Sequence, residues 1–269
     1  MIWFWIALAI SISIGFCVKR EICWYHYIWV LLPIENYGIQ VAGAIIKPYM
    51  VFGVLIVLAL WLKRRALTID TTLFFLLFFA FFTDFLNGLI TASIMQHIQM
   101  VICCYIFYAY SQLIDQETDC WRQIEDVAIA LLIGFGAVFV IASFVPNMGG
   151  VSTVDRYADG MYLGYTQYGG GHEYRLRGFT IDPNACITEF LPGFCYAIYR
   201  FQEHTGWDKL RNALAVCIYV YNVILTNSRM ALLFTVICFI AILFGLYKKT
   251  RNKVISLNEQ IQKIDKVPL

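Results

Sequence analysis

The sequence is poor in charged residues, histidine and proline. Only 14% of its 269 residues are charged, and it holds four His and six Pro. A soluble globular domain carries about 25% charged residues, and a disordered chain is also poor in large apolar side chains. Here 60% of the residues are apolar, which a soluble fold of this size could not hide, because such a fold leaves about 30% of its chain area in water. Disordered chains and cytosolic enzymes are therefore excluded, and the composition predicts an integral membrane protein.

The sequence also lacks any C-x-x-C pair, although it contains nine cysteines. Six of the cysteines lie inside apolar runs: Cys17, Cys103, Cys104, Cys195, Cys217 and Cys238. In such runs cysteine usually serves as a small buried hydrophobe. A secreted disulfide scaffold is therefore excluded, and we expect neither a metal site nor a cofactor.

Long apolar runs are abundant. A spanning helix needs about 20 apolar residues. Runs close to this length fall at about 2–18, 41–62, 71–90, 92–114, 127–145, 185–201, 210–226 and 230–247. They predict an all-α, polytopic membrane helix bundle of about eight transmembrane helices. The first run has no cationic flank or cleavage site, so it is expected to be retained. Segment 22–34 is too short to span, and its Trp and Tyr residues suit an interfacial position.

The distribution of Lys and Arg predicts the orientation of these helices, because cytoplasmic loops are enriched in both. Segments 63–70, 115–126, 202–209 and 248–269, with Arg200 and Arg211 at adjoining helix ends, hold 13 of the 20 basic residues. This favours an N-terminus and a C-terminus that both lie inside. The chain then divides into a five-span bundle (1–145), an external loop (146–183), three spans (184–247) and a basic cytoplasmic tail (248–269).

The external loop 146–183 is unusual in its length and composition. It contains eight glycines and five tyrosines. Long loops often bind ligands; Tyr can stack on a sugar ring, and Gly lets the backbone approach a ligand closely. A loop that lies along the membrane surface, with Tyr as an interfacial belt, would have the same composition. Both interpretations stay open at this point.

Three of the arginines on the predicted external side, where positive charge is disfavoured, flank helix ends and are candidates for a site. Arg175 and Arg177 precede Asn184 and the N-terminus of the sixth span, where free N–H groups favour an anion. Arg229 follows Ser228 in a very short connection between the last two spans, and Asn227 or Ser228 can cap the next helix. The arginines can bind a phosphate group, snorkel to lipid headgroups or pair with a carboxylate.

Other polar residues are weaker candidates for a site. Asp84 lies in the outer half of the third span, where a carboxylate can line a pathway or make an interhelical hydrogen bond. Lys47 near the outer end of the second span can reach a phosphate or snorkel. His172 is the loop residue whose ordinary pKa best suits proton exchange near neutral pH, although a lone loop histidine is often incidental.

Two strings resemble the O-antigen ligase and Wzy-type polysaccharide polymerase superfamily. The first is R-x-x-G followed by Pro-Asn, here Arg175–Gly178 with Pro183-Asn184. The second is T-x-S-R-x-A-L, here Thr226 to Leu232. The strings cover the second half of the chain, whereas the first half resembles the family only in its spans. Members usually have further spans and an external domain that supplies a base, so the resemblance indicates a short or C-terminally truncated member.

The resemblance implies a metal-independent glycosyltransferase of the bacterial cytoplasmic (inner) membrane. Such enzymes take a glycan from an undecaprenyl diphosphate carrier and pass it to another glycan or to lipid A–core. By this resemblance Arg175 or Arg177 together with Arg229 would hold the diphosphate. From the residues themselves, Asn184, Ser228, Asp84 and Lys47 could support the site. His172, which does not match the family motif, is the candidate base with the most suitable ordinary pKa, and Glu173 and Asp182 are the alternatives. The expected partners are membrane lipids and other polysaccharide-assembly proteins, not nucleic acid. A transporter, a lipid-binding protein and an inactive fragment of the family are the alternatives.

Overall fold

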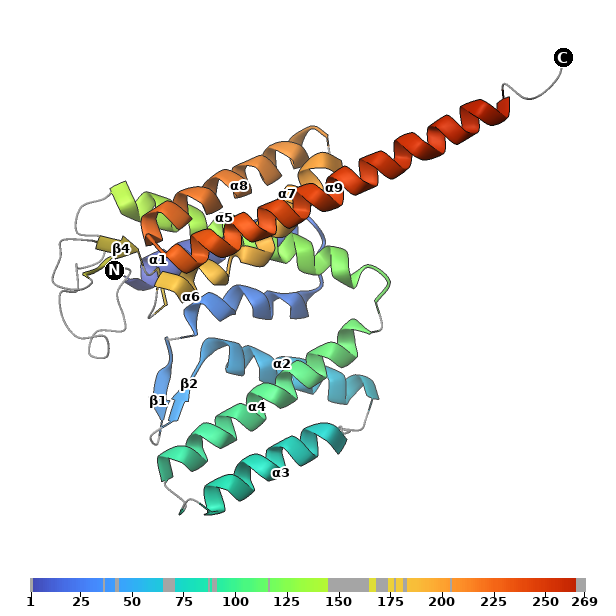
Figure 1. Ribbon diagram of the computed structural model, residues 1–269. Coiled ribbons are helices and arrows are strands. Elements are labelled where there is room, and N and C mark those ends of the chain that lie inside the picture. Colours follow the sequence, from blue (N-terminus) through green and yellow to red (C-terminus); the bar gives the residue numbers. More distant parts are fainter. Residues whose placement is uncertain are drawn as a thin grey trace.

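The computed structural model describes residues 2–35, 37–41, 44–64, 71–86, 88, 91–115, 117–144, 165–167, 174–176, 178–180, 183–203 and 205–264. It is mostly helical, as the sequence predicts (Figure 1). The helices are α1 (Ile2–Val18), the 3-10 helix η1 (Trp24–Ile34), α2 (Pro48–Arg64), α3 (Thr71–Leu86), α4 (Thr91–Ile114), α5 (Cys120–Phe144), α6 (Pro183–Thr188), α7 (Leu191–Glu203), α8 (Trp207–Thr226) and α9 (Arg229–Ile264).

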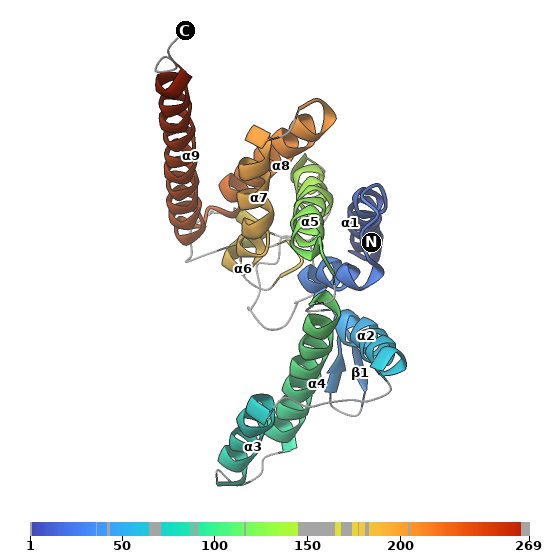
Figure 2. The ribbon, with the colours of Figure 1, turned by 90° about the vertical axis from the view of Figure 1, so that its right-hand side faces the viewer.

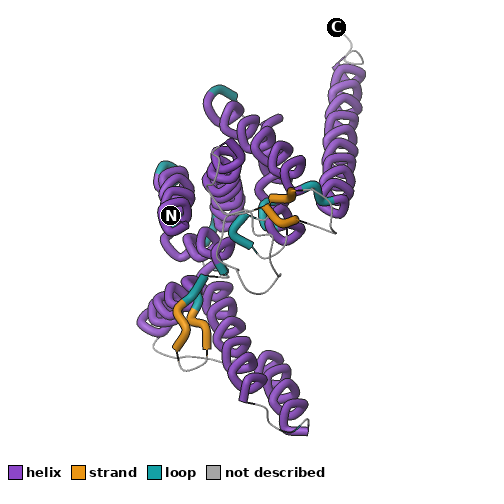
Figure 3. The backbone as a smooth tube through the Cα atoms, turned by 90° about the vertical axis from the view of Figure 1, so that its left-hand side faces the viewer, coloured by secondary structure: helices purple, strands orange, loops and turns teal. Residues whose placement is uncertain are grey.

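Two short antiparallel hairpins interrupt the helical chain (Figure 3). Strand β1 (Ile39–Val41) pairs with β2 (Ala44–Ile46), with Ile39 opposite Ile46. Strand β3 (Tyr165–Gln167) pairs with β4 (Tyr174–Leu176), with Thr166 opposite Arg175. The second hairpin lies within the loop 146–183 and contacts α8.

Helix α5 is the centre of the larger core and packs against α1, α7, α8 and η1 (Figure 2). Small residues on α5 allow this close packing. A Cβ atom added at Gly134 would lie 2.1 Å from Ser13 Oγ of α1, and one at Gly136 would lie 2.5 Å from an Ile218 methyl group of α8. The backbones of α1 and α8 therefore lie close against α5, as is common between helices in membranes.

Helices α2, α3 and α4 form a second layer beside this core. Its buried residues come from α2, α4 and η1, and Ile28, Ile56 and Ile106 are fully or almost fully buried. Helix α3 packs on α4 and carries many exposed phenylalanines, among them Phe74, Phe75, Phe78, Phe79, Phe82 and Phe85. Exposed apolar side chains in such number fit a lipid-facing helix.

Among the described residues, one helix is long and apolar enough to cross a membrane by itself. This is α5, with 25 residues and 67% of its most apolar window buried inside the molecule. Shorter apolar stretches lie in α1, α2, α4 and α9. The predicted sixth span, 185–201, is interrupted, because α6 ends at Thr188 and α7 begins at Leu191.

The ends of the helices gather at two opposite ends of the molecule. We call one of them the tail end. The residues after α1 and the start of α5 lie there side by side, because the Cys23 backbone N–H donates to Gln123 Oε1 at 2.8 Å. At the other end, the hinge end, the Tyr37 ring lies 5.7 Å from the Trp3 ring and 6.1 Å from the Phe179 ring. The 3-10 helix η1 connects the two ends and runs antiparallel to α1 (Figure 1).

This arrangement corrects two parts of the predicted topology. Segment 22–34 does not lie across the end of the bundle as an interfacial segment, because η1 packs lengthwise against α1, α5 and α2. Arg20 and Asp208 were predicted on opposite sides of the membrane, yet they form an ion pair. Trp3 near the N-terminus therefore lies at the hinge end with Phe179, which differs from the placement predicted from eight spans.

Candidate functional site

The two strings that resemble the polymerase family meet at the hinge end. Ser228 Oγ donates a hydrogen bond to Asn184 Oδ1, although 44 residues separate them in the sequence. Asn184 stands in the first turn of α6, and Ser228 directly precedes α9. The contact joins the Pro183-Asn184 string to the Ser228-Arg229 string.

Local capping rules explain why the second string folds as it does. Asn227 adopts the left-handed conformation with φ 45° and ψ 39° and ends α8, and its backbone N–H donates to Ile224 O. Ser228 Oγ accepts a hydrogen bond from the Ala231 backbone N–H at 3.1 Å, which is the geometry of an N-cap. Ser228 is thus the N-cap of α9, one of the two residues predicted for that role. The buried Thr226 hydroxyl donates to Val223 O at 2.9 Å and completes the end of α8.

The first string also has a structural basis, in the turn around Gly178. Gly178 has φ +59°, and an added Cβ would lie 2.5 Å from the Phe139 ring and 2.7 Å from Cys186 Sγ. A side chain here would therefore be strained and would clash. The adjacent Phe179 ring is buried edge-on against the rings of Phe135 and Phe139 at 5.7 and 5.2 Å. This anchor holds the chain that leads into α6 against α5.

Arg229 is the cation that this capping geometry presents at the hinge end. Its side chain is exposed, while Ser228 before it and Ala231 after it are each 2% exposed. Within the described part of the chain, Arg229 makes no side-chain hydrogen bond or ion pair, including with Glu189, one of the carboxylates considered as a partner. The N-terminal turn of α9 repels a cation, so an anion beside Arg229 would be stabilised by the guanidinium and by the free N–H groups.

The other predicted site residues are only partly described. Lys47 lies 3.9 Å from Glu35 and 5.8 Å from the Tyr49 ring, so its ammonium group already has a carboxylate partner. Arg175 is described only through its backbone in β4, and Asp84 only through its backbone in α3. His172 and Arg177 lie outside the described residues.

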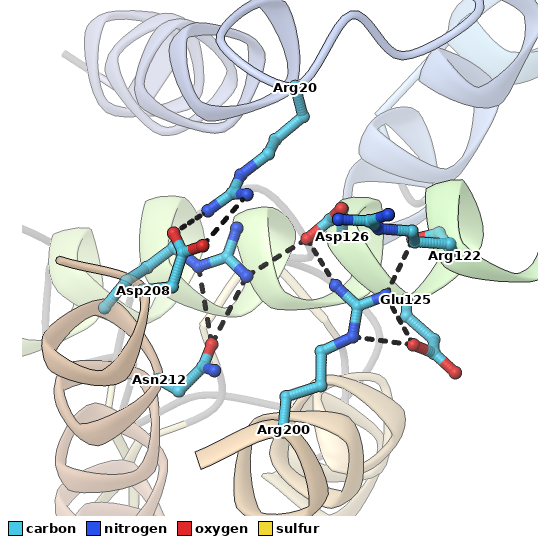
Figure 4. Close-up of polar contacts among 8 residues, drawn as sticks. Arg20, Arg122, Glu125, Asp126, Arg200, Asp208 and Asn212 are labelled. Carbon is cyan, nitrogen blue, oxygen red and sulfur yellow. Dashed lines mark hydrogen bonds and ion pairs between the residues drawn. The ribbon is translucent and has the colours of Figure 1, made fainter. Parts of the chain in front are cut away.

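A buried ionic network at the tail end was not predicted from the sequence (Figure 4). Asp126 Oδ1 of α5 accepts from Arg200 Nη1 of α7 at 2.7 Å and from Arg211 Nη2 of α8 at 3.0 Å. All three side chains are about 5% exposed. Arg200 also donates to Glu125, and Arg211 donates to Asn212. Because the charges satisfy one another, the network joins three helices and presents no free cation to a ligand.

A third polar cluster joins η1 to the end of α4 and the following turn. The Tyr110 hydroxyl accepts from Trp29 Nε1 at 2.6 Å and lies 2.7 Å from Nδ1 of the fully buried His26. Glu117 accepts from the Cys23 thiol at 2.9 Å. Partial burial raises the pKa of Glu117, but hydrogen bonds from Cys23 and neighbouring groups and the proximity of His26 outweigh it, so the pKa is lowered. No group of three His, Cys, Asp or Glu that could hold a metal occurs among the described side chains.

Comparison with known proteins identifies no relative of this chain. No protein-family model matches it, and neither a curated protein nor a solved structure matches it. The site is therefore interpreted from its own geometry and from the resemblance of its two strings.

Proposed function

We propose that the chain is a membrane glycosyltransferase of the O-antigen ligase or polymerase type in the bacterial cytoplasmic membrane. The observation that carries the proposal is the Ser228–Asn184 hydrogen bond. Two strings that resemble the family only together, and that are far apart in the sequence, lie side by side. A chain with an unrelated function would have no reason to bring them into contact.

The proposed topology places the hinge end outside the cell and the tail end in the cytoplasm. Nine segments then connect the two ends, with η1 as the additional one, and the N-terminus lies outside. Lys19 and Arg20 move to the cytoplasmic side, which raises its share to 15 of the 20 Lys and Arg residues. A larger share of basic residues inside supports this orientation over the one predicted with eight spans.

The proposed substrate is a glycan linked to undecaprenyl diphosphate. When the bond between sugar and phosphate breaks, negative charge develops on the diphosphate, and fixed cations stabilise that charge. Arg229 would bind the diphosphate together with Arg175 or Arg177, while Ser228 and Asn184 hold the N-terminus of α9 in place. The acceptor hydroxyl, on a second glycan or on lipid A–core, would pass its proton to His172.

Binding of undecaprenyl diphosphate to the purified chain in lipid nanodiscs tests this proposal. Arg229→Ala should weaken binding about tenfold or more, because it removes a bidentate charge-assisted contact. Arg229→Lys should restore it only in part, since an ammonium group lacks the planar fork.

Lys63→Ala is the matched control, because Lys63 is an exposed cation at the end of α2 on the tail end. It should bind the diphosphate like the native chain. Equal affinities for the native chain and Arg229→Ala would contradict the proposal.

A further inference from the structure

A partly open pocket at the edge of the larger core is lined by a glutamate for which the proposed glycosyl transfer has no use. The pocket has a volume of about 360 Å³, within the range of small-molecule sites. Its walls come from η1 (Trp29 and Pro33), α5 (Ala128 and Leu131) and the junction of α6 and α7 with α7 itself (Glu189 and Tyr196).

Glu189 is the ionisable acidic residue of this lining, and it stands where the helix is interrupted. Its backbone N–H closes α6 by donating to Ala185 O at 3.2 Å, and α7 begins two residues later. Glu189 Oε2 is buried and has no hydrogen-bond partner among the described residues. A buried carboxylate oxygen without a donor is unfavourable, so a ligand that supplies a donor or a positive charge would be bound favourably.

The pocket is distinct from the site at the hinge. Helix α6 contacts both α8 and α9, and its Asn184 in the first turn bonds to Ser228, whereas only its last residue, Thr188, joins η1, α5 and α7 in the pocket lining. Figure 2 shows α6 between α5 and α9. A ligand in the pocket and a diphosphate beside Arg229 would therefore occupy separate sites.

The chemistry of the walls restricts the ligand to one class. Trp29 and Tyr196 present aromatic rings, and aromatic faces attract organic cations. The Trp29 indole N–H is already bonded to the Tyr110 hydroxyl, and the Thr188 hydroxyl to backbone carbonyls of α6. The Trp29 and Thr188 donors are therefore engaged, and an anionic ligand would lie beside the Glu189 side chain.

We infer that this pocket binds an organic ammonium ion with an apolar body, whose positive group contacts Glu189 and whose apolar part lies along α5. The inference does not depend on the proposed glycosyltransferase activity. Ionisable groups inside a helix bundle commonly bind a substrate or an ion, and an interrupted helix at such a group is a frequent feature of these sites.

Calorimetric titration of the purified chain in nanodiscs with 2-phenylethylamine tests the inference, with 2-phenylethanol as the neutral ligand of the same shape. Empty nanodiscs provide the blank. The amine should bind the native chain about tenfold tighter than the alcohol, as expected for one charge-assisted contact. Glu189→Gln keeps the shape of the side chain and should remove this preference.

Glu21→Gln is the matched control, since Glu21 is an exposed carboxylate in the turn after α1, outside the pocket lining. It should keep the preference for the amine. Ala128→Phe should abolish binding of both ligands by filling the pocket, while the helical circular dichroism spectrum stays native. Equal binding of amine and alcohol to the native chain, or an unchanged preference in Glu189→Gln, would overturn the inference.

Discussion

Asp126 is the residue on which the tail-end network depends, because both buried arginines share its Oδ1. Asp126→Asn would leave Arg200 and Arg211 without their common charge. We expect it to destabilise the fold by about 3–5 kcal/mol, the usual result of removing one partner from a buried ion pair. Glu125→Gln is the control, since the Glu125 side chain is 23% exposed and pairs only with Arg200. Thermal unfolding in detergent should show a much smaller loss for Glu125→Gln, and equal losses would contradict this role of Asp126.

Glu117 should make the stability of the fold sensitive to acid. Its pKa lies below the ordinary value of 4.5, so its contacts stabilise the folded chain above that pH and are lost as the pH falls through the lowered pKa. Native protein should therefore unfold at a higher temperature than Glu117→Gln at neutral pH. Below pH 4.5 this difference should shrink, and a difference that is constant with pH would contradict the assignment.

Sequence reasoning at this scale succeeded for local contacts and failed for distant ones. Ser228 could be predicted as an N-cap because its partner, Ala231, lies three residues away. Arg200 and Arg211 were interpreted only as markers of the cytoplasmic side, because their partner Asp126 lies 74 and 85 residues away. No rule of spacing relates residues on three different helices. The adjacent acidic pair Glu125-Asp126 at the start of an apolar run was the available signal.

Among the elements, the contact between α1 and α5 should be very sensitive to side-chain size. An alanine Cβ at Gly134 would lie 2.1 Å from Ser13 Oγ and 2.7 Å from Ala9 O, so Gly134→Ala should cost about 1–3 kcal/mol through overpacking. Gly15→Ala on α1 is the matched control, because no atom lies within 4 Å of an added Cβ there. It should be neutral or slightly stabilising in the same unfolding assay, since alanine favours helix.

Most helices could be predicted from apolar runs, and the exceptions have physical reasons. The run at 127–145 lies within α5, and the run at 210–226 lies within α8. Segment 22–34 looked too short to cross because an α-helix rises about 1.5 Å per residue. As a 3-10 helix rising about 2 Å per residue, the 11 residues of η1 cover about 22 Å. The break after Thr188 falls in a continuous apolar run, so hydropathy alone did not reveal it.

For the whole molecule, labelling of single added cysteines in intact cells can decide the orientation. Tyr165→Cys in β3 should react with a membrane-impermeant maleimide, because the loop lies outside in the proposed topology. Lys19→Cys should react only after lysis, since residues 19–23 lie at the tail end with Asp208. The native chain is the control for its nine cysteines. Labelling of both positions in intact cells would restore the orientation predicted from the apolar runs.

The global arrangement was the least predictable level from sequence alone. The count of Lys and Arg gave the correct grouping for segments 115–126 and 202–209, which the structure brings to one end through Asp126, Arg200 and Arg211. It separated Arg20 from Asp208, which the structure pairs, because it did not count η1 as an element that connects the two ends. One error in a single short element was therefore enough to reverse the position of the N-terminus.

Helix α9 is long and begins at the Ser228 N-cap, so a small change of angle at Ser228 would move its far end over a large distance. Its 36 residues extend about 54 Å, nearly twice the thickness of a bilayer core, without interruption. It packs on α6 and α7, and its Thr235 hydroxyl lies 3.1 Å from the Tyr219 hydroxyl of α8. Figure 1 shows its far part projecting beyond the other helices. By that geometry, a tilt of about 10° at Ser228 would displace the far end by about 9 Å. A ligand that shifts the hinge end would in this way produce a large movement at the far end of α9.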